Sequence, residues 1–297
     1  MDNRQEISEF LRSRRAKISP EQAGFSRAGN RRVSGLRREE VAVIAGVSVE
    51  YYKRIERGAL AGVSAEVLGA IAEALHLNEA EAAHLFDLAR AAHGTRTTSQ
   101  RSSVQRVRPG IRRMLDSIVG SPASVLNEQM DLLAANDLGR AFYSEILDSD
   151  IARGNNARFA FLDPRARDFY PHWGKSADQI TAVLRRHVGR NPGDRGLSNL
   201  VGELAAQSSE FSKRWAAYNV KYHHTGRKRI NHPTAGELEL DYEAIELPFD
   251  PGLTILTYFA EPESPTAERL ALLASWAATS DRESIERAAK AAAHEDG

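Results

Sequence analysis

Apolar side chains recur at helical spacing through residues 5–93, with breaks where helices are expected to end. Ile7, Phe10 and Leu11 share one face of a first helix, because side chains three and four positions apart lie together. Further helices are predicted at 36–45, at 48–57, after Ser64 and after Asn78, where serine and asparagine are favoured as caps. The first 93 residues therefore predict an all-α domain of five helices.

The second half of the chain mixes strand and helix patterns. Residues 238–247 alternate apolar and acidic side chains, and residues 253–259 are rich in β-branched and aromatic types. The turn at 250–252 between them predicts an antiparallel hairpin with one wet, acidic face. Another strand is expected at 228–231, and helices at 109–119, 136–147, 176–188, 195–207 and 265–279. These elements predict an α+β domain with a small antiparallel sheet.

A polar segment separates the two patterns. Residues 94–108 are basic, rich in serine and threonine and without periodicity, which is typical of a linker. We therefore expect an N-terminal domain at 1–93, the linker at 94–108, a second domain at 109–280 and a tail at 281–297. A chain of 297 residues is long enough for two separate cores.

Composition narrows the class of protein. The chain has no cysteine, so disulfides and thiolate chemistry are excluded. The polar N-terminus does not resemble a signal peptide, and no apolar run reaches the length of a membrane span. We expect a cytoplasmic protein with no membrane partner.

The zero net charge is a cancellation between the two halves. Residues 1–113 hold 20 Lys and Arg against 13 Asp and Glu, whereas residues 114–297 hold 20 against 27. Basic side chains gather at 4–38 and 95–113, which points to an end of the protein that binds a polyanion. Charge alone leaves open the alternative of a solvated, arginine-rich surface.

Residues 37–58 carry the pattern of a helix-turn-helix. Ala42 is small where two helices cross closely, and Gly46 lies in the turn, where a positive φ is cheap for glycine. Val47 and Ile55 fill the space between the helices. The second helix would then enter the major groove of double-stranded DNA. The alternative, a helical hairpin inside a core, would have to bury Lys53 and Arg54.

Two kinds of DNA contact are expected from this motif. Arg54 and Lys53 can reach guanine or phosphates, Glu50 can accept from cytosine, and Val49 can contact a thymine methyl group. The basic residues before the second helix are expected to bind phosphates. The predicted DNA-binding residues are Arg31, Arg32, Arg37, Arg38, Ser48, Val49, Glu50, Tyr51, Lys53 and Arg54. One such module presents little surface, so a homodimer on paired half-sites of an operator is expected.

Residues 5–93 resemble the phage-repressor-like, XRE-type helix-turn-helix. The likeness rests on the helix order, the turn glycine and the Ile55–Gly58 ending of the second motif helix. Members of that family often begin the first motif helix with glutamine, and here Arg38 stands at that position. We still expect Arg38 to contact a phosphate, but we do not expect it to support base readout as the glutamine does.

Residues 109–262 resemble the MmyB-like ligand-binding domain that follows such a motif in bacterial regulators. The stretches that carry the likeness are 132–136, 161–164, 169–173, 184–185, 189–194, 209–211 with Trp215, 232–233 with 236–238, and 247–248 with 250–252. The resemblance implies a PAS-like α+β fold whose apolar pocket holds a fatty-acid-like or other small apolar ligand. No other cofactor is expected.

Aromatic side chains in this half are numerous enough to line such a pocket, although each could instead fill a core. Arg185 and His232 are the polar groups expected to orient a ligand carboxylate, with a structural salt bridge or turn contact as the alternative. The predicted ligand-binding residues are Phe142, Phe161, Trp173, Arg185, Phe211, Trp215, Tyr218, His232 and Tyr258.

Motifs of enzymes are weak throughout the chain. There is no Gly-x-Ser-x-Gly elbow, and the 174–176 Gly-Lys-Ser lacks the earlier P-loop glycine, which is Phe169 here. The histidines of the second half lack metal-ligand spacing, so no metal site is expected; they are His172, His187, His223, His224 and His232.

The sequence thus predicts a ligand-responsive transcription factor and not an enzyme. Two alternatives stay open: an enzyme tethered to its own promoter by the helix-turn-helix, and a regulator whose second half only dimerises or docks a protein partner.

Overall fold

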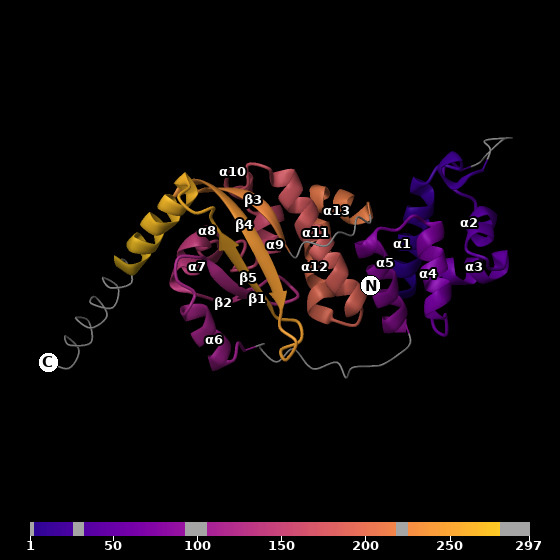
Figure 1. Cartoon of the computed structure of the whole chain (residues 1–297), viewed down its shortest axis with the longest axis horizontal. Coiled ribbons are helices and arrows are strands. Elements are labelled where there is room, and N and C mark those ends of the chain that lie inside the picture. The colour runs from indigo at the N-terminus through magenta and orange to yellow at the C-terminus, as the bar shows by residue number, and fades with distance from the viewer. Residues whose placement is uncertain (1–2, 26–32, 93–105, 218–224, 280–297) are drawn as a thin grey trace. The chain divides into compact units, whose positions relative to one another are not determined.

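The computed structural model describes residues 3–25, 33–92, 106–217 and 225–279 (Figure 1). The chain divides into two compact units, each built from two stretches of sequence. Unit 1 contains 1–102 and 178–222, and unit 2 contains 103–177 and 223–297. Within the described residues, no helix is long and apolar enough to cross a membrane.

Unit 1 begins with the five helices expected from the sequence. They are α1 (Asn3–Lys17), α2 (Arg38–Ile44), α3 (Val49–Glu56), α4 (Ala65–Ala74) and α5 (Glu79–Ala92). A short 3₁₀ helix, η1 (Glu21–Ala23), was not predicted. Three predicted caps are confirmed, since Ser48, Ser64 and Asn78 each accept a hydrogen bond from the backbone amide three residues later, at 3.0 to 3.3 Å.

The helix-turn-helix packs as its residue types predict. Val41, Ala42 and Ile55 are buried in the core of these helices, and Val47 packs against it. Gly46 has a φ of 65°, the left-handed conformation that makes glycine favourable in the turn between α2 and α3. The close packing of α2 against α3 therefore follows from side chains that are local in sequence.

The remaining helices of unit 1 come from the second half of the chain. They are α12 (Arg195–Gln207), α13 (Ser209–Ala216) and the part of α11 (Trp173–Arg190) that follows Ala177. Helices at 176–188 and 195–207 were expected, and α13 was not. The sequence assigned all of them to the second domain, whereas the structure groups residues 178–222 with the helix-turn-helix.

Unit 2 is built on a five-stranded antiparallel sheet in the order β2-β1-β5-β4-β3. The strands are β1 (Ala123–Leu126), β2 (Leu132–Ala135), β3 (Thr225–His232), β4 (Gly236–Glu246) and β5 (Thr254–Phe259). The predicted β4–β5 hairpin and the extra strand β3 are confirmed. The small antiparallel sheet and the α+β class of this region are therefore also confirmed.

Helices line the sheet of unit 2. They are α6 (Pro109–Asp116), α7 (Asp137–Phe142), α8 (Ser144–Leu147), α9 (Asn156–Leu162), α10 (Ala166–Phe169) and a helix at 265–279. We call the sheet face that carries Lys228, Tyr242 and Tyr258 the inner face; Tyr258 packs there against Phe142 of α7. On the other face, Val125 and Ile255 pack with Leu115 of α6.

Candidate DNA-binding interface and ligand-binding region

Helix α3 divides its side chains between the core and solvent. Tyr52 and Ile55 are buried, whereas Glu50 and Arg54 are exposed and Lys53 is half-buried. Of the other predicted contacts, Ser48 is exposed at the start of the helix, and Val49 and Tyr51 are half-buried. The alternative in which Lys53 and Arg54 lie within a core is therefore not observed for Arg54.

The charged side chains of α3 hold one another in place. Lys53 Nζ donates to Glu50 Oε1 at 2.6 Å, and this hydrogen bond lowers the pKa of the exposed Glu50 carboxyl. The Arg54 guanidinium lies over the Tyr51 ring, 4.9 Å from its centroid. Glu50 is thus an ionised acceptor near the N-terminus of the helix, with a cation on the turn that follows.

Glu56 ties together the helices that surround α3. It is buried, and its carboxylate accepts from Arg15 Nε of α1 at 2.6 Å and from Arg38 Nε of α2. The bond to Glu56 raises the pKa of Arg38, whose side chain remains partly exposed. The predicted contact Arg38 is therefore held by a core acid at the N-terminus of α2, next to the exposed Arg37.

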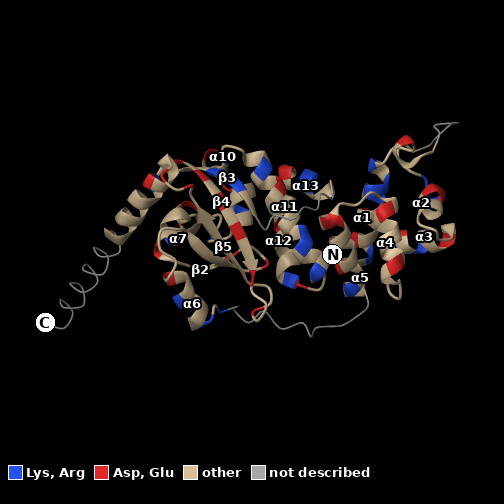
Figure 2. Ribbon diagram, in the orientation of Figure 1, with Lys and Arg blue, Asp and Glu red and all other residues tan. Residues whose placement is uncertain are grey.

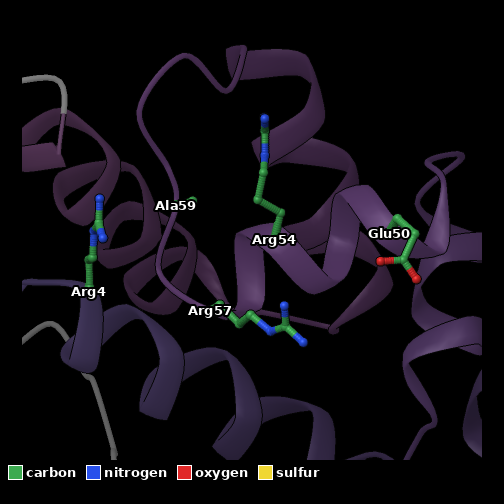
Figure 3. Close-up of a pocket in the computed structure, with 5 residues that line it drawn as sticks. All are labelled: Arg4, Glu50, Arg54, Arg57 and Ala59. Carbon is green, nitrogen blue, oxygen red and sulfur yellow. The ribbon is translucent and has the colours of Figure 1, made fainter.

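A hollow of about 420 Å³ opens beside the recognition helix. Its lining residues are Arg4, Glu50, Arg54, Arg57 and Ala59 (Figure 3). Arg4 and Arg57 were not among the predicted DNA-binding residues. The first turn of α1 lies close to the end of α3 because residue 58 is glycine. Gly58 has a φ of 93°, and a Cβ there would lie 2.4 Å from Arg4 O. Gly58 marks the end of α3 in the sequence, but nothing local indicates what packs on it.

Arg31 and Arg32, which were also predicted to bind DNA, lie outside the described residues. The others occupy the start of α2 and the exposed part of α3. Three arginines, Arg4, Arg54 and Arg57, line the hollow, and Arg37 and Arg38 lie at the start of α2. Guanidinium groups in this setting suit phosphate oxygens and the acceptors of guanine.

The predicted ligand-binding residues fall into three separate groups. Phe142, His232 and Tyr258 belong to unit 2, where the ring centroids of Phe142 and Tyr258 are 4.9 Å apart. Phe161 and Trp173 form an edge-to-face pair at 6.0 Å, also in unit 2.

Arg185, Phe211 and Trp215 belong to unit 1, with Phe211 stacked on Trp215 at 5.4 Å. Tyr218 lies outside the described residues. The described members of the predicted set are therefore divided between the two units.

His232 is bound through both ring nitrogens to backbone groups. Nε2 lies 3.0 Å from Ala141 O, and Nδ1 accepts from the amides of Thr234 and Ala235 at 3.2 and 3.1 Å. This pattern assigns the proton to Nε2 of a neutral ring, and burial lowers the pKa of His232. Its role toward a ligand stays a prediction, and the turn contact named as its alternative is present.

Arg185 is fully buried in unit 1. Its Nη1 donates to Glu6 Oε1 of α1 at 2.5 Å, Nη2 donates to Trp215 O, and the guanidinium lies 4.0 Å from a Trp215 ring centroid. Burial lowers the pKa of Arg185 and raises that of Glu6. The structural salt bridge that the sequence left open for Arg185 is thus observed, and its partner is a helix of the DNA-binding motif.

Helix α5 also packs on α11 within unit 1. Gly189 of α11 lies against His84 of α5, where a Cβ would come 2.5 Å from His84 Cε1. Arg190 Nε donates to Asp87 Oδ2 at 3.1 Å. Together with the Glu6–Arg185 pair, these contacts join the helix-turn-helix to α11.

An exposed recognition helix with a charged outer face, followed in the chain by an α+β domain with an aromatic core, defines a DNA-binding transcription regulator with a ligand-binding domain. Residues 6–85 match the helix-turn-helix domain family, and residues 107–273 match the MmyB-like transcription regulator ligand binding domain. The chain belongs to the MmyB-like transcription regulators. No curated protein matches it. Among the described residues, no cluster of histidine and acidic side chains could hold a metal ion.

Proposed function

We propose that this regulator binds a specific operator as a homodimer and that a small apolar, fatty-acid-like ligand of unit 2 controls the binding. The observation that carries the proposal is the exposed charged face of α3, in a chain whose second half matches a ligand-binding domain. In this proposal the protein acts in the cytoplasm, catalyses no reaction and needs no metal or other cofactor.

Base contacts are assigned to α3 and phosphate contacts to the surfaces around it. Glu50, Lys53 and Arg54 present one acceptor and two donor groups, which is what readout of base edges in the major groove requires. Arg37 and Arg38 at the start of α2 and the arginines of the hollow supply positive charge. Charge of this kind positions a protein on the duplex without reading its sequence.

The ligand is assigned to unit 2, where aromatic rings crowd the inner face of the sheet. To act as a switch, the ligand must bind one arrangement of the dimer more tightly than the other, because equal affinity for both shifts nothing. The residues expected to be nearest to it are Phe142, Tyr143, Tyr170 and Tyr258.

Two experiments test the two halves of the proposal. Full-length protein is first used to select duplexes from a random library, and the selected sequence is compared with a scrambled duplex of equal composition. An enriched, two-fold symmetric motif bound by a dimer supports operator recognition. Failure to enrich any sequence would contradict it.

The second experiment is native mass spectrometry of the purified protein, followed by denaturing extraction and identification of any released molecule. A fatty-acid-like species that changes operator affinity supports the ligand assignment. A second half that forms dimers and binds no small molecule would instead favour a purely dimerising or docking role.

A further inference from the structure

The edge strand β3 carries its cations on both faces of the sheet. Arg227 and Arg229 point to the outer face, and Lys228 between them points to the inner face, because side chains alternate along a strand. Figure 2 shows the basic residues of β3 beside acidic residues of β4. The cations on the two faces differ in their neighbours.

On the outer face each arginine is matched to an acid across the ladder. Arg227 makes two hydrogen bonds to Asp241, its direct register partner, at 2.9 and 3.0 Å. Arg229 lies opposite Glu239 and contacts it at 3.5 Å. These cations are neutralised within the sheet itself.

On the inner face Lys228 lies opposite Leu240, an apolar residue. Its ammonium rests over the ring of Tyr170, 4.5 Å from the centroid. Within the described residues the structure gives its Nζ no hydrogen bond and no ion pair. Burial lowers the pKa of Lys228 to about 8, and no acidic neighbour offsets that effect. A half-buried cation without a counter-ion is a costly arrangement unless something else supplies the charge.

Tyr242 provides a second donor on the same face. It lies on β4 two residues beyond Leu240, at the position diagonal to Lys228, a separation that long side chains can bridge. Its hydroxyl has no hydrogen-bond partner in the described part of the chain. The residue opposite Tyr242 is Gly226, where a Cβ would lie 3.1 Å from the hydroxyl. Glycine at 226 thus leaves room for the Tyr242 ring on this face.

We propose that Lys228 and Tyr242 bind the carboxylate of the unit 2 ligand. An ammonium and a phenol donor on an otherwise apolar, aromatic face match a molecule with one anionic end and an apolar body. The inference rests on the ligand-binding function proposed above and specifies the end of the ligand that is recognised. Arg185 and His232, the groups first expected in this role, are taken up by Glu6 and Trp215 and by backbone groups respectively.

The test compares dodecanoate with 1-dodecanol, which share a chain and differ in the charged end. Isothermal titration calorimetry on the full-length protein is expected to show dodecanoate binding at least about tenfold more tightly, because hydrogen bonds to charged groups contribute that much. Lys228→Met keeps the length of the side chain without the charge and is expected to lose most of the preference for dodecanoate. Tyr242→Phe is expected to lose part of the preference.

The matched control is Arg229→Met, on the same strand but the outer face, which should retain the full preference for dodecanoate. Lys228→Met removes an uncompensated charge, so its urea midpoint should not fall below that of the wild type.

Equal affinity of the wild type for the two molecules, or an undiminished preference in Lys228→Met, would overturn the carboxylate site. Binding of neither molecule would instead contradict the apolar-ligand part of the proposed function.

Discussion

Glu6 and Arg185 are 179 residues apart in the chain, yet their side chains meet at 2.5 Å in a site from which water is excluded. Glu6 lies in the first turn of α1, and Arg185 lies in α11, which begins in the ligand-binding region. Burial opposes both charges, since it raises the pKa of Glu6 and lowers that of Arg185. Each charge therefore compensates the other in the folded protein.

Loss of either partner of this pair should destabilise the protein strongly. We expect Glu6→Gln or Arg185→Met to lower the free energy of unfolding by about 3–5 kcal/mol, because the remaining charge is stranded in the core. Urea denaturation of the full-length protein measures the change. The double variant Glu6→Leu with Arg185→Met should recover much of the loss.

The matched control for the pair is Arg90→Met. Arg90 is largely exposed and Asp87 keeps Arg190 as a second partner, so the loss of Arg90 should cost less than about 1 kcal/mol. A cost for Glu6→Gln as small as that of the control would show that the buried pair does not hold α1 to α11.

His84 should make the stability of the protein fall in mild acid. The ring is buried, neither nitrogen has a hydrogen-bond partner among the described residues, and burial lowers the pKa of His84 to about 3. The histidine of the unfolded chain has a pKa of about 6.5, so below that pH it is protonated while His84 of the folded protein stays neutral. The contribution of His84 to the free energy of unfolding is thus fully present above about pH 6.5 and is lost as the pH falls toward about 3.

Urea unfolding of wild type and His84→Met at two pH values checks this prediction. Between about pH 7.5 and about pH 5.5 the wild type should lose about 1.4 kcal/mol more than the variant. Identical losses in the two proteins would mean that His84 is not held neutral.

Gly58→Ala should disturb the junction between α3 and α1. The added Cβ would lie 2.4 Å from Arg4 O, in a backbone conformation that is already unfavourable for alanine. Gly62→Ala is the matched control, since Gly62 also has a positive φ but no atom within 4 Å of the new Cβ. We expect Gly58→Ala to cost at least about 1 kcal/mol more in urea denaturation. If the two substitutions lower the free energy of unfolding equally, the backbone conformation explains the whole effect and the contact with Arg4 contributes nothing.

Arg57 and Arg54 should affect DNA binding in different ways. Arg57→Ala removes a charge from the hollow, so it should weaken binding to selected and random duplexes alike. It should also reduce the salt slope by about 0.9 between about 50 and about 200 mM salt. Arg54→Ala should instead lose about 1–3 kcal/mol of preference for the selected sequence, with little change in stability.

Fluorescence anisotropy across the salt series separates the two variants, with Arg229→Ala in unit 2 as the control. A salt slope for Arg57→Ala equal to that of the wild type would exclude a phosphate contact there. Operator affinity unchanged in Arg54→Ala would remove the base-reading assignment of that residue.

The features that could be predicted are those that depend on residues close together in the sequence. The caps at Ser48 and Ser64, the turn at Gly46 and the faces of α2 and α3 depend on residues within a few positions of one another. Strands β1 and β2 were missed because each has four residues, too few to show alternation. The partner of Arg185 was missed because nothing near it in the sequence points to Glu6.

Lys228 illustrates an intermediate case. Its position between two arginines looks like a solvated charge run, but the alternation of β3 places it on the apolar face. Only the strand register shows that Lys228 lies opposite Leu240 and not opposite an acidic residue.

The course of the chain through unit 1 has a consequence for exchanging modules between related regulators. The unit is assembled from 1–102 and 178–222, so a chimera joined at the linker would bring a foreign α11 to meet Glu6, His84 and Asp87. The foreign helix would need arginines that reach Glu6 and Asp87 and a small residue that fits against His84. A transplant that changes ligand choice while preserving the DNA-binding head should therefore carry 103–177 and 223–297 and leave 178–222 with its host. The residues that must be kept together to preserve operator binding thus extend beyond the helix-turn-helix.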